Sequence, residues 1–357
     1  MNNMKKHSTY FIIFYFLFPS LILVAQETGD TGNNVELQET DTLTKTVSPV
    51  LNSDLITKDE TGTKVELIIK PILNDVLRYN IKSSITSIEK SSETNDKKLI
   101  STEETNYFYT EEVFEISSAG IITFKIKFDS IIVVLTALSD SEERTIYNSN
   151  MKNYIWSHPD YIHYSSFIHE DFYIRVSTKG EITSTYGMEK MYENLFSAFG
   201  DTLTINHKED FKNYYNQDYF INILQSQFQK FPEKRIFRDS GWVRSFESDI
   251  IVFPIRNDFN YKLTDIKQNS DEYIVTVDAG LSIKVLNKKV NDESITYELQ
   301  NSVFSGKANY EFNLSRGCLI SKLSENNIEL KLKISDNTDS IQSYYLIKNS
   351  LSVKLLQ

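Results

Sequence analysis

The sequence predicts a mainly β protein of the α+β class, in which two antiparallel β-meander sheets are joined by a helical insert. Aromatic residues make up 13% of the chain, nearly all Tyr and Phe, which favour pleated and half-buried surfaces. Runs with a two-residue apolar period recur at short intervals, and one central stretch changes to a helical period. The predicted units are a signal peptide over 1–25, a disordered acidic linker over 26–63, a first meander over 64–187, the helical insert over 188–232 and a second meander over 233–357.

The N-terminus has the features of a signal peptide. Lys5 and Lys6 precede an apolar run over 11–25, and Ala25 supplies the small residue expected at a cleavage site. A membrane anchor is the rival interpretation, but the run is shorter than a usual spanning segment and contains Pro19. We therefore expect export to the periplasm or the extracellular medium, with no stable membrane span after cleavage. Cleavage changes the formal charge from −11 to −13, because the segment carries two lysines and no acid.

Charge and cysteine content limit the function classes. A chain with a formal charge of −11 has no attractive field for phosphate backbones or anionic membrane surfaces, so we expect no nucleic acid partner. The single cysteine, Cys318, excludes an intramolecular disulfide. We expect Cys318 to be a small buried strand residue; a reactive thiol is the alternative.

The first meander follows the polar and acidic stretch 26–63, whose lack of apolar periodicity is typical of disorder. Its clearest strand covers 121–135, where Ile and Phe alternate with Thr and Lys, as expected for a sheet with one buried face. The unit ends on a hairpin over 172–186, in which Gly180 supplies the positive φ of a tight turn.

The helical insert begins directly after this hairpin. Met188, Met191, Tyr192 and Leu195 have helical spacing, and we expect this stripe to be core rather than the lining of an apolar groove. A second helical region covers about 208–231. Residues 216–218 are expected to break it and cap a further helix, and Pro232 ends it.

The second meander contains a stretch that repeats the end of the first. Residues 310–321 follow the order of residues 172–184: an aromatic start, an alternating strand, a Ser, a basic-Gly turn and a second alternating strand. This similarity predicts an internal duplication. Chance similarity between hairpins of a β-rich chain is the alternative.

Several short motifs carry a resemblance to a protein family. They are Val-Ser-Thr-Lys-Gly-Glu-Ile at 176–182, Phe-Pro-Glu-Lys at 231–234, Gly241-Trp242 and Arg-Gly-Cys-Leu at 316–319. With these motifs the chain resembles an uncharacterised, domain-of-unknown-function family of exported bacterial β-rich proteins, although that family usually spaces its Gly and Trp apart. The layout also resembles, more loosely, the half-barrel of periplasmic lipoprotein carriers. Neither resemblance implies a catalytic residue.

The sequence contains no recognisable catalytic, cofactor or metal motif. Histidines and acids gather within 158–171: His158, His163 and His169 with Asp160, Glu170 and Asp171. Their spacing matches no standard ligand motif, so we expect a polar loop and no metal site. Asp239-Ser240 before Gly241-Trp242 is expected to be a structural turn with a packed Trp rather than a nucleophile loop.

These observations favour an exported, non-enzymatic protein without a cofactor. One-sided strands and an apolar helix stripe favour a concave sheet face that binds a hydrophobic ligand or a lipoprotein-like partner. The first alternative is a structural or interaction module of the cell envelope with a filled core and no ligand cavity. The second is an unrecognised hydrolase whose site gathers residues distant in sequence.

Overall fold

A computed structural model describes most of the chain beyond residue 54. The expected signal peptide 1–25 and most of the linker 26–63 lie outside the described residues. Those residues are 55–60, 62–92, 97–138, 141–151, 162–200, 203–269, 272–292, 294–336 and 338–356.

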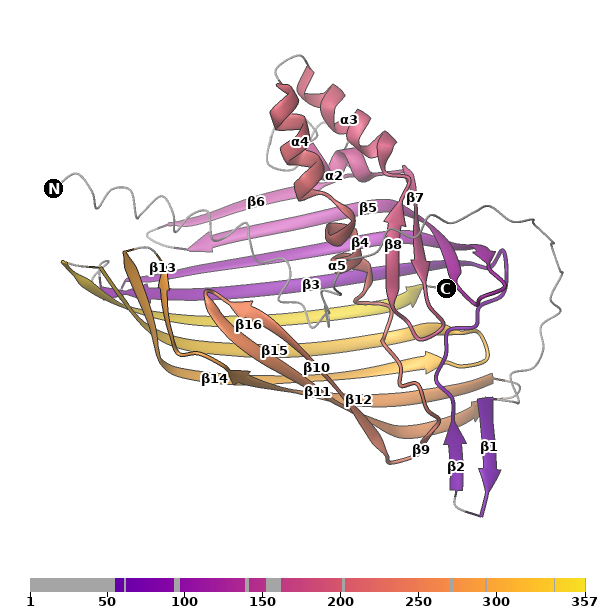
Figure 1. Ribbon diagram of the computed structural model, residues 1–357. Helices are drawn as coiled ribbons and strands as arrows, with labels where there is room; N and C mark the ends of the chain where they lie inside the picture. Colours follow the sequence, from indigo (N-terminus) through magenta and orange to yellow (C-terminus); the bar gives the residue numbers. More distant parts are fainter. Residues whose placement is uncertain are drawn as a thin grey trace.

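The described residues form long strands and a few short helices (Figure 1). The strands before the helical insert are β1 (Ile56–Asp59), β2 (Gly62–Val65), β3 (Val76–Ser91), β4 (Lys98–Ile116), β5 (Ile122–Leu138), β6 (Glu142–Asn148), β7 (Asp171–Val176) and β8 (Ile182–Tyr186). The helices are α2 (Ile162–Phe167), α3 (Glu189–Phe199), α4 (Ile205–Tyr214) and α5 (Gln217–Leu224). The later strands are β9 (Ile236–Phe237), β10 (Gly241–Ile250), β11 (Phe253–Asn269), β12 (Glu272–Val285), β13 (Lys289–Asp292), β14 (Ile295–Asn313), β15 (Cys318–Ser335) and β16 (Ser340–Leu356).

The predicted fold class is confirmed. One antiparallel sheet has 13 strands, in the order β10-β11-β12-β14-β15-β16-β3-β4-β5-β7-β8, with β13 paired to β14 and β6 to β5. The two meanders join edge to edge, because β16 pairs with β3 along almost its whole length. They therefore form one continuous sheet rather than one sheet each.

The second sheet is small and corrects the expected linker boundary. Strands β1, β2 and β9 form a three-stranded sheet, and β1 lies inside the stretch 26–63 that was expected to be disordered. Leu55, Val65 and Leu67 are buried and belong to the main hydrophobic cluster, which anchors this segment to the core. The end of the predicted linker is therefore folded.

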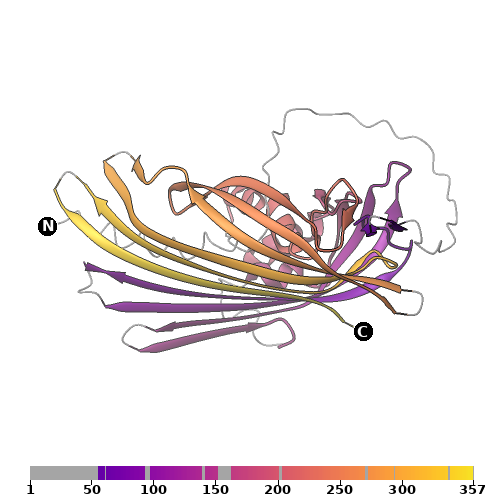
Figure 2. The ribbon, with the colours of Figure 1, turned by 90° about the horizontal axis from the view of Figure 1, so that it is seen from below.

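The alternation expected for the first meander is confirmed in β5. Phe124, Ile126 and Phe128 are buried, while Lys125 and Lys127 on the opposite face are half-buried. Buried positions of this kind line the inner face of the sheet and pack against the helical insert in one hydrophobic cluster. Figure 2 shows that the sheet is curved and that the helices lie on its concave side, while the long strands extend beyond them.

The helical insert corresponds to α3, α4 and α5. Met188, Met191 and Leu195 are buried, so this stripe is core, as predicted. The break at 216–218 is also confirmed, because the Asn216 side chain accepts a hydrogen bond from the backbone N–H of Tyr219 at 3.2 Å and caps α5.

The structure corrects the end of the insert and adds one helix. Helix α5 ends at Leu224 rather than near Phe231, because the chain leaves the helix as turns and then extends. The stretch before Phe172, expected to be a loop, contains α2. Among the described residues, no helix is both long enough and apolar enough to cross a membrane.

The two similar turns, at Gly180 and at Gly317, both lie against residues 66–70. The backbone N–H of Ile69 donates to Thr178 O at 2.8 Å, in the turn that contains Gly180. Gly317 in the turn between β14 and β15 lies against the backbone of Lys70, where an added Cβ would be 2.5 Å from the Lys70 nitrogen. Both glycines have positive φ, 85° for Gly180 and 64° for Gly317. The two similar turns therefore lie against the same stretch of chain, through Thr178 in the first turn and Gly317 in the second, and the duplication itself stays a prediction.

Replacement of Gly180 tests how far the fold depends on this turn. A Cβ at Gly180 would lie 1.9 Å from the backbone oxygen of Gln229, and the positive φ adds further strain. We expect Gly180→Ala to lower the free energy of unfolding by about 3 kcal/mol in urea denaturation. Gly280→Ala is the control, because a Cβ there meets no atom within 4 Å. Equal stability of the two variants would contradict this assignment.

Candidate functional site

The candidate site is organised by residues 225–231, which we call the inner segment. This segment leaves α5 and runs along the concave face of the sheet, and Gln225 to Gln229 are all buried. The Gln225 side chain accepts from Ile182 N at 3.2 Å and donates to Gly180 O at 2.9 Å. The backbone N–H of Phe231 donates to Lys179 O at 2.8 Å. The Gly180 turn therefore fixes both ends of the inner segment.

A buried carboxyl lies beneath the inner segment. Glu111 on β4 is only 2% exposed, and Gln227 Nε2 donates to its Oε2 at 2.7 Å. The hydroxyl of Tyr109 donates to Gln227 Oε1, and the Tyr109 ring stacks on Tyr79 at 5.7 Å. Burial raises the pKa of Glu111 to about 8, and the hydrogen bond from Gln227 opposes this only in part. At neutral pH the carboxyl is therefore mostly uncharged.

A buried amine contacts the inner segment from another strand of the sheet. Lys322 on β15 is 5% exposed, and its Nζ donates to the backbone oxygen of Ser226 at 3.1 Å. Burial lowers the pKa of Lys322 to about 7. The hydroxyl of Ser226 donates to Ile223 O at 2.7 Å. The amine therefore meets the carbonyl of Ser226, and the hydroxyl of that serine is directed elsewhere.

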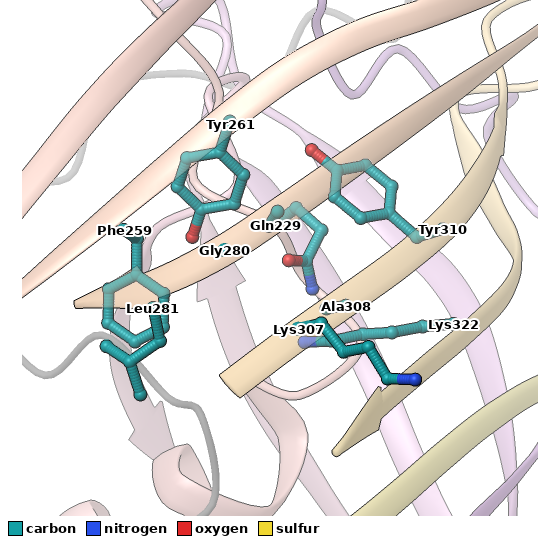
Figure 3. A pocket seen from close by; sticks show the side chains of 10 residues that line it. Gln229, Phe259, Tyr261, Gly280, Leu281, Lys307, Ala308, Tyr310 and Lys322 are labelled. Carbon is teal, nitrogen blue, oxygen red and sulfur yellow. The ribbon is translucent and has the colours of Figure 1, made fainter. Parts of the chain in front are cut away.

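A small pocket opens beside Lys322 (Figure 3). It leaves about 10 Å³ for the centre of a water molecule, which is close to the room that one water needs. Its polar groups include the side chains of Gln229, Tyr261 and Tyr310, and the backbone of Gly280 forms part of its wall. The Tyr310 hydroxyl is buried and has no hydrogen-bond partner among the described residues.

Rows of residues with short side chains run across the strands of the sheet, next to this pocket. The pairing registers align two neighbouring rows of residues on the inner face, from β12 to β4. We call their short members the small-residue band: Ala279, Gly306, Ala308, Ser324, Asn326, Asn349, Ser83 and Thr105. The band separates two hydrophobic clusters, one beneath the helices and one where the hairpin of β10 and β11 meets β14 and β15.

Aromatic rings flank the band on β10 and β11. Trp242 stacks on Tyr261 with a centroid distance of 4.9 Å, and Phe246 stacks on Phe259 at 5.6 Å. Trp242 is thus a half-buried strand residue, as the sequence suggested for a structural element. The neighbouring Ser240 donates its hydroxyl to Phe237 O at 2.7 Å and so stabilises the turn before β10.

The described members of the histidine cluster, and Cys318, pack against other residues or form backbone hydrogen bonds. His158 and Asp160 lie outside the described residues. The His163 ring stacks on Tyr215 at 4.9 Å, and the backbone N–H of His169 donates to Phe128 O at 2.9 Å. In the described part of the chain, no three His, Cys, Asp or Glu residues are grouped to hold a metal. Cys318 is buried at the start of β15, as predicted, and burial raises the pKa of its thiol to about 12.

The polar residues of this site were not predicted from the sequence, although the sequence carries a signal for them. Glu111 has the same strand phase as the buried Tyr109 and Val113. Lys322 has the same phase as the buried Ile328 and other apolar residues of β15. A charged residue in phase with a buried apolar face is a candidate for an inward-facing polar group.

The fold and the site define an open, curved antiparallel sheet whose concave face carries a helical cover and buried polar groups. The chain belongs to a family of unknown function (DUF6263), because residues 119–319, more than half of its length, match that family. The resemblance to an uncharacterised family is thereby confirmed. A comparison with curated proteins gives no match.

Similar solved structures share only part of this geometry. A lipovitellin structure, titled for lipid–protein interactions, has a TM-score of 0.39 and 11% identity, covering 81% of this chain and 25% of that one. The chain thus spans about a quarter of the lipovitellin chain. OccK5 (OpdH) of Pseudomonas aeruginosa has a TM-score of 0.22 and 8% identity, covering 81% of this chain and 100% of its own. Scores this low give no basis for assigning a ligand or an activity.

The two buried ionisable groups predict an unusual dependence of stability on pH. Folding raises the pKa of Glu111 from 4.5 to about 8, so the folded chain holds more protons in this window and stability falls as pH rises. Folding lowers the pKa of Lys322 from 10.5 to about 7, so stability rises with pH between these values. Each slope is at most about 1.4 kcal/mol per pH unit. We expect the combined contribution of the two groups to the free energy of unfolding to pass through a minimum near neutral pH. Urea denaturation at a series of pH values measures it.

Two substitutions separate these contributions. Glu111→Gln keeps an acceptor for Gln227 and should remove the fall in stability at acidic to neutral pH, whereas Lys322→Met should remove the rise at alkaline pH. Glu115→Gln and Lys331→Met are the controls, because both residues are exposed on the same two strands. A Glu111→Gln profile parallel to that of the wild type would refute the buried-carboxyl assignment.

Proposed function

We propose that this protein is an exported, non-enzymatic binding protein that takes a hydrophobic ligand on its concave face, at the partly exposed end of the small-residue band formed by Ala279, Gly306 and Ala308. The observation that carries the proposal is the position of the band between two hydrophobic clusters. Ala279, Gly306 and Ala308 project little from the sheet, so an apolar chain laid over them also contacts the taller side chains on both sides.

Apolar contact supplies the free energy of such binding. Each buried methylene contributes about 0.8 kcal/mol, so an extended acyl chain gains affinity steadily with length while it lies on the band. The flanking rings of Phe246 and Phe259 add flat apolar surface at the β10 end.

Sequence features support export and a binding role. The apolar run over 11–25 follows a basic start, and the single cysteine leaves the folded chain independent of disulfides. The hydroxyls of Ser226 and Ser240 donate to backbone oxygens of their own turns, so both have structural roles.

One observation favours a second candidate, a structural or interaction module of the cell envelope. The pocket beside Lys322 leaves about 10 Å³ for the centre of a water molecule, which is far less than a hydrophobic molecule occupies. In that case the concave face is a filled core, and the partner is an envelope protein that binds elsewhere.

Binding of an acyl series to the delipidated protein tests the proposal. We expect saturable binding from octanoate to hexadecanoate, measured by calorimetry, with an affinity that rises about fourfold per methylene until the band is covered. No saturable binding at any chain length, together with copurification of envelope proteins, would establish the interaction module instead.

A pair of substitutions locates the ligand. Ala308→Trp fills the band from the inner face, and we expect it to weaken binding at least about tenfold by steric exclusion. Asn309→Trp places the same ring on the exposed face of the same strand and should leave the affinity within about twofold. Equal effects of the two variants would remove the band as the binding surface.

A further inference from the structure

Two cationic side chains lack an acidic partner among the described residues: Lys322 lines the pocket, and Arg244 is next to it, paired with the lining residue Phe259 across β10 and β11. Neither Lys322 nor Arg244 forms an ion pair with a described carboxylate. Lys322 Nζ donates to Ser226 O at 3.1 Å, and Arg244 Nη2 donates to Phe231 O at 2.6 Å. The Arg244 Nε is buried and has no hydrogen-bond partner in the described part of the chain.

A phenol completes this group of donors. Tyr310 pairs directly with Lys322 across β14 and β15, and its buried hydroxyl lacks a described partner. Arg244 contacts the inner segment through Phe231 O, next to the strand that carries Tyr310. Burial raises the pKa of Tyr310, and the positive charge of Arg244 opposes that shift. Burial also raises the pKa of Tyr261 to about 12, again with an opposing contribution from Arg244. Figure 3 shows Tyr261, Tyr310 and Lys322 around the pocket.

These groups have the chemistry of an anion site. An ammonium, a guanidinium Nε–H and a phenol O–H are all donors, and a carboxylate is an acceptor only. Burial without a counter-charge disfavours the charged form of Lys322, and an anion that enters the pocket stabilises that charged form. The space for about one water suits a carboxylate oxygen better than a bulkier phosphate group.

We infer that the pocket lined by Lys322 and Tyr310, with Arg244 next to it, holds the carboxylate of a long-chain acid whose apolar chain lies along the partly exposed end of the small-residue band. This inference rests on the proposed function, and it specifies the polar end of the ligand. Lys322 lies one row from Ser324 and Ala308, so the head group and the start of the band are neighbours on the sheet. A ligand therefore needs both an apolar chain and a terminal negative charge.

A matched pair of ligands tests the head group separately from the chain. Dodecanoate and dodecanol have the same chain, and we expect the folded wild-type protein to bind dodecanoate at least about tenfold more tightly by calorimetry. Equal affinities would overturn the carboxylate site and leave the proposed function intact. No binding of either ligand would overturn both.

Substitutions then assign the preference to residues. Lys322→Met keeps an unbranched side chain that is one atom shorter and has no charge, and it should reduce the preference for dodecanoate about tenfold, with dodecanol affinity unchanged. Tyr310→Phe removes only the hydroxyl and should reduce the preference about threefold. Lys331→Met removes a lysine from the exposed face of the same strand and should retain the full preference. A preference that survives both Lys322→Met and Tyr310→Phe would place the carboxylate elsewhere.

Discussion

The close contact between the Gly180 turn and the inner segment is the constraint on which the rest of the site depends. Gly180 lacks the Cβ that would collide with Gln229 O, and the hydrogen bonds to Lys179 O and to Gly180 O hold the segment at both ends. A segment without regular structure can be buried only if its polar groups find partners. The turn and the Gln225 side chain supply them, and this allows the inner segment to lie on the sheet.

Because the inner segment lies on the sheet, its polar groups contact Glu111 and Lys322 inside the apolar core, where burial shifts the pKa values of both. Gln227 contacts Glu111 on β4, and Ser226 O contacts Lys322 on β15, from neighbouring positions of the same segment. Neither ionisable group has a charged partner close enough to be a main cause of its shift, so burial pushes each toward its neutral form. Lys322 also borders the small-residue band. The inner segment thus holds both the polar network around Glu111 and the candidate ligand site beside Lys322.

Much of the fold could be predicted from local pattern. Two-residue alternation located β5 and the hairpin of β7 and β8, and helical spacing located α3. The early end of α5 could not be predicted, because Gln225 and Phe228 fit a helical period but are held by hydrogen bonds to a distant turn. The similarity of the Gly180 and Gly317 turns was visible in the sequence. The position of both turns against residues 66–70 was not visible in the sequence.

The sequence by itself determined which residues face the core, where the helical insert lies and that Cys318 is buried, because these depend on spacing along the chain. Only the tertiary structure decided that β16 pairs with β3 to merge the meanders, and that Glu111 and Lys322 meet the inner segment. The tertiary structure also determined which residues form the small-residue band, because those residues come from separate strands that are aligned by pairing register. Alternation fixes the face of a residue but not its neighbour across the sheet, and the ligand site is made of such neighbours.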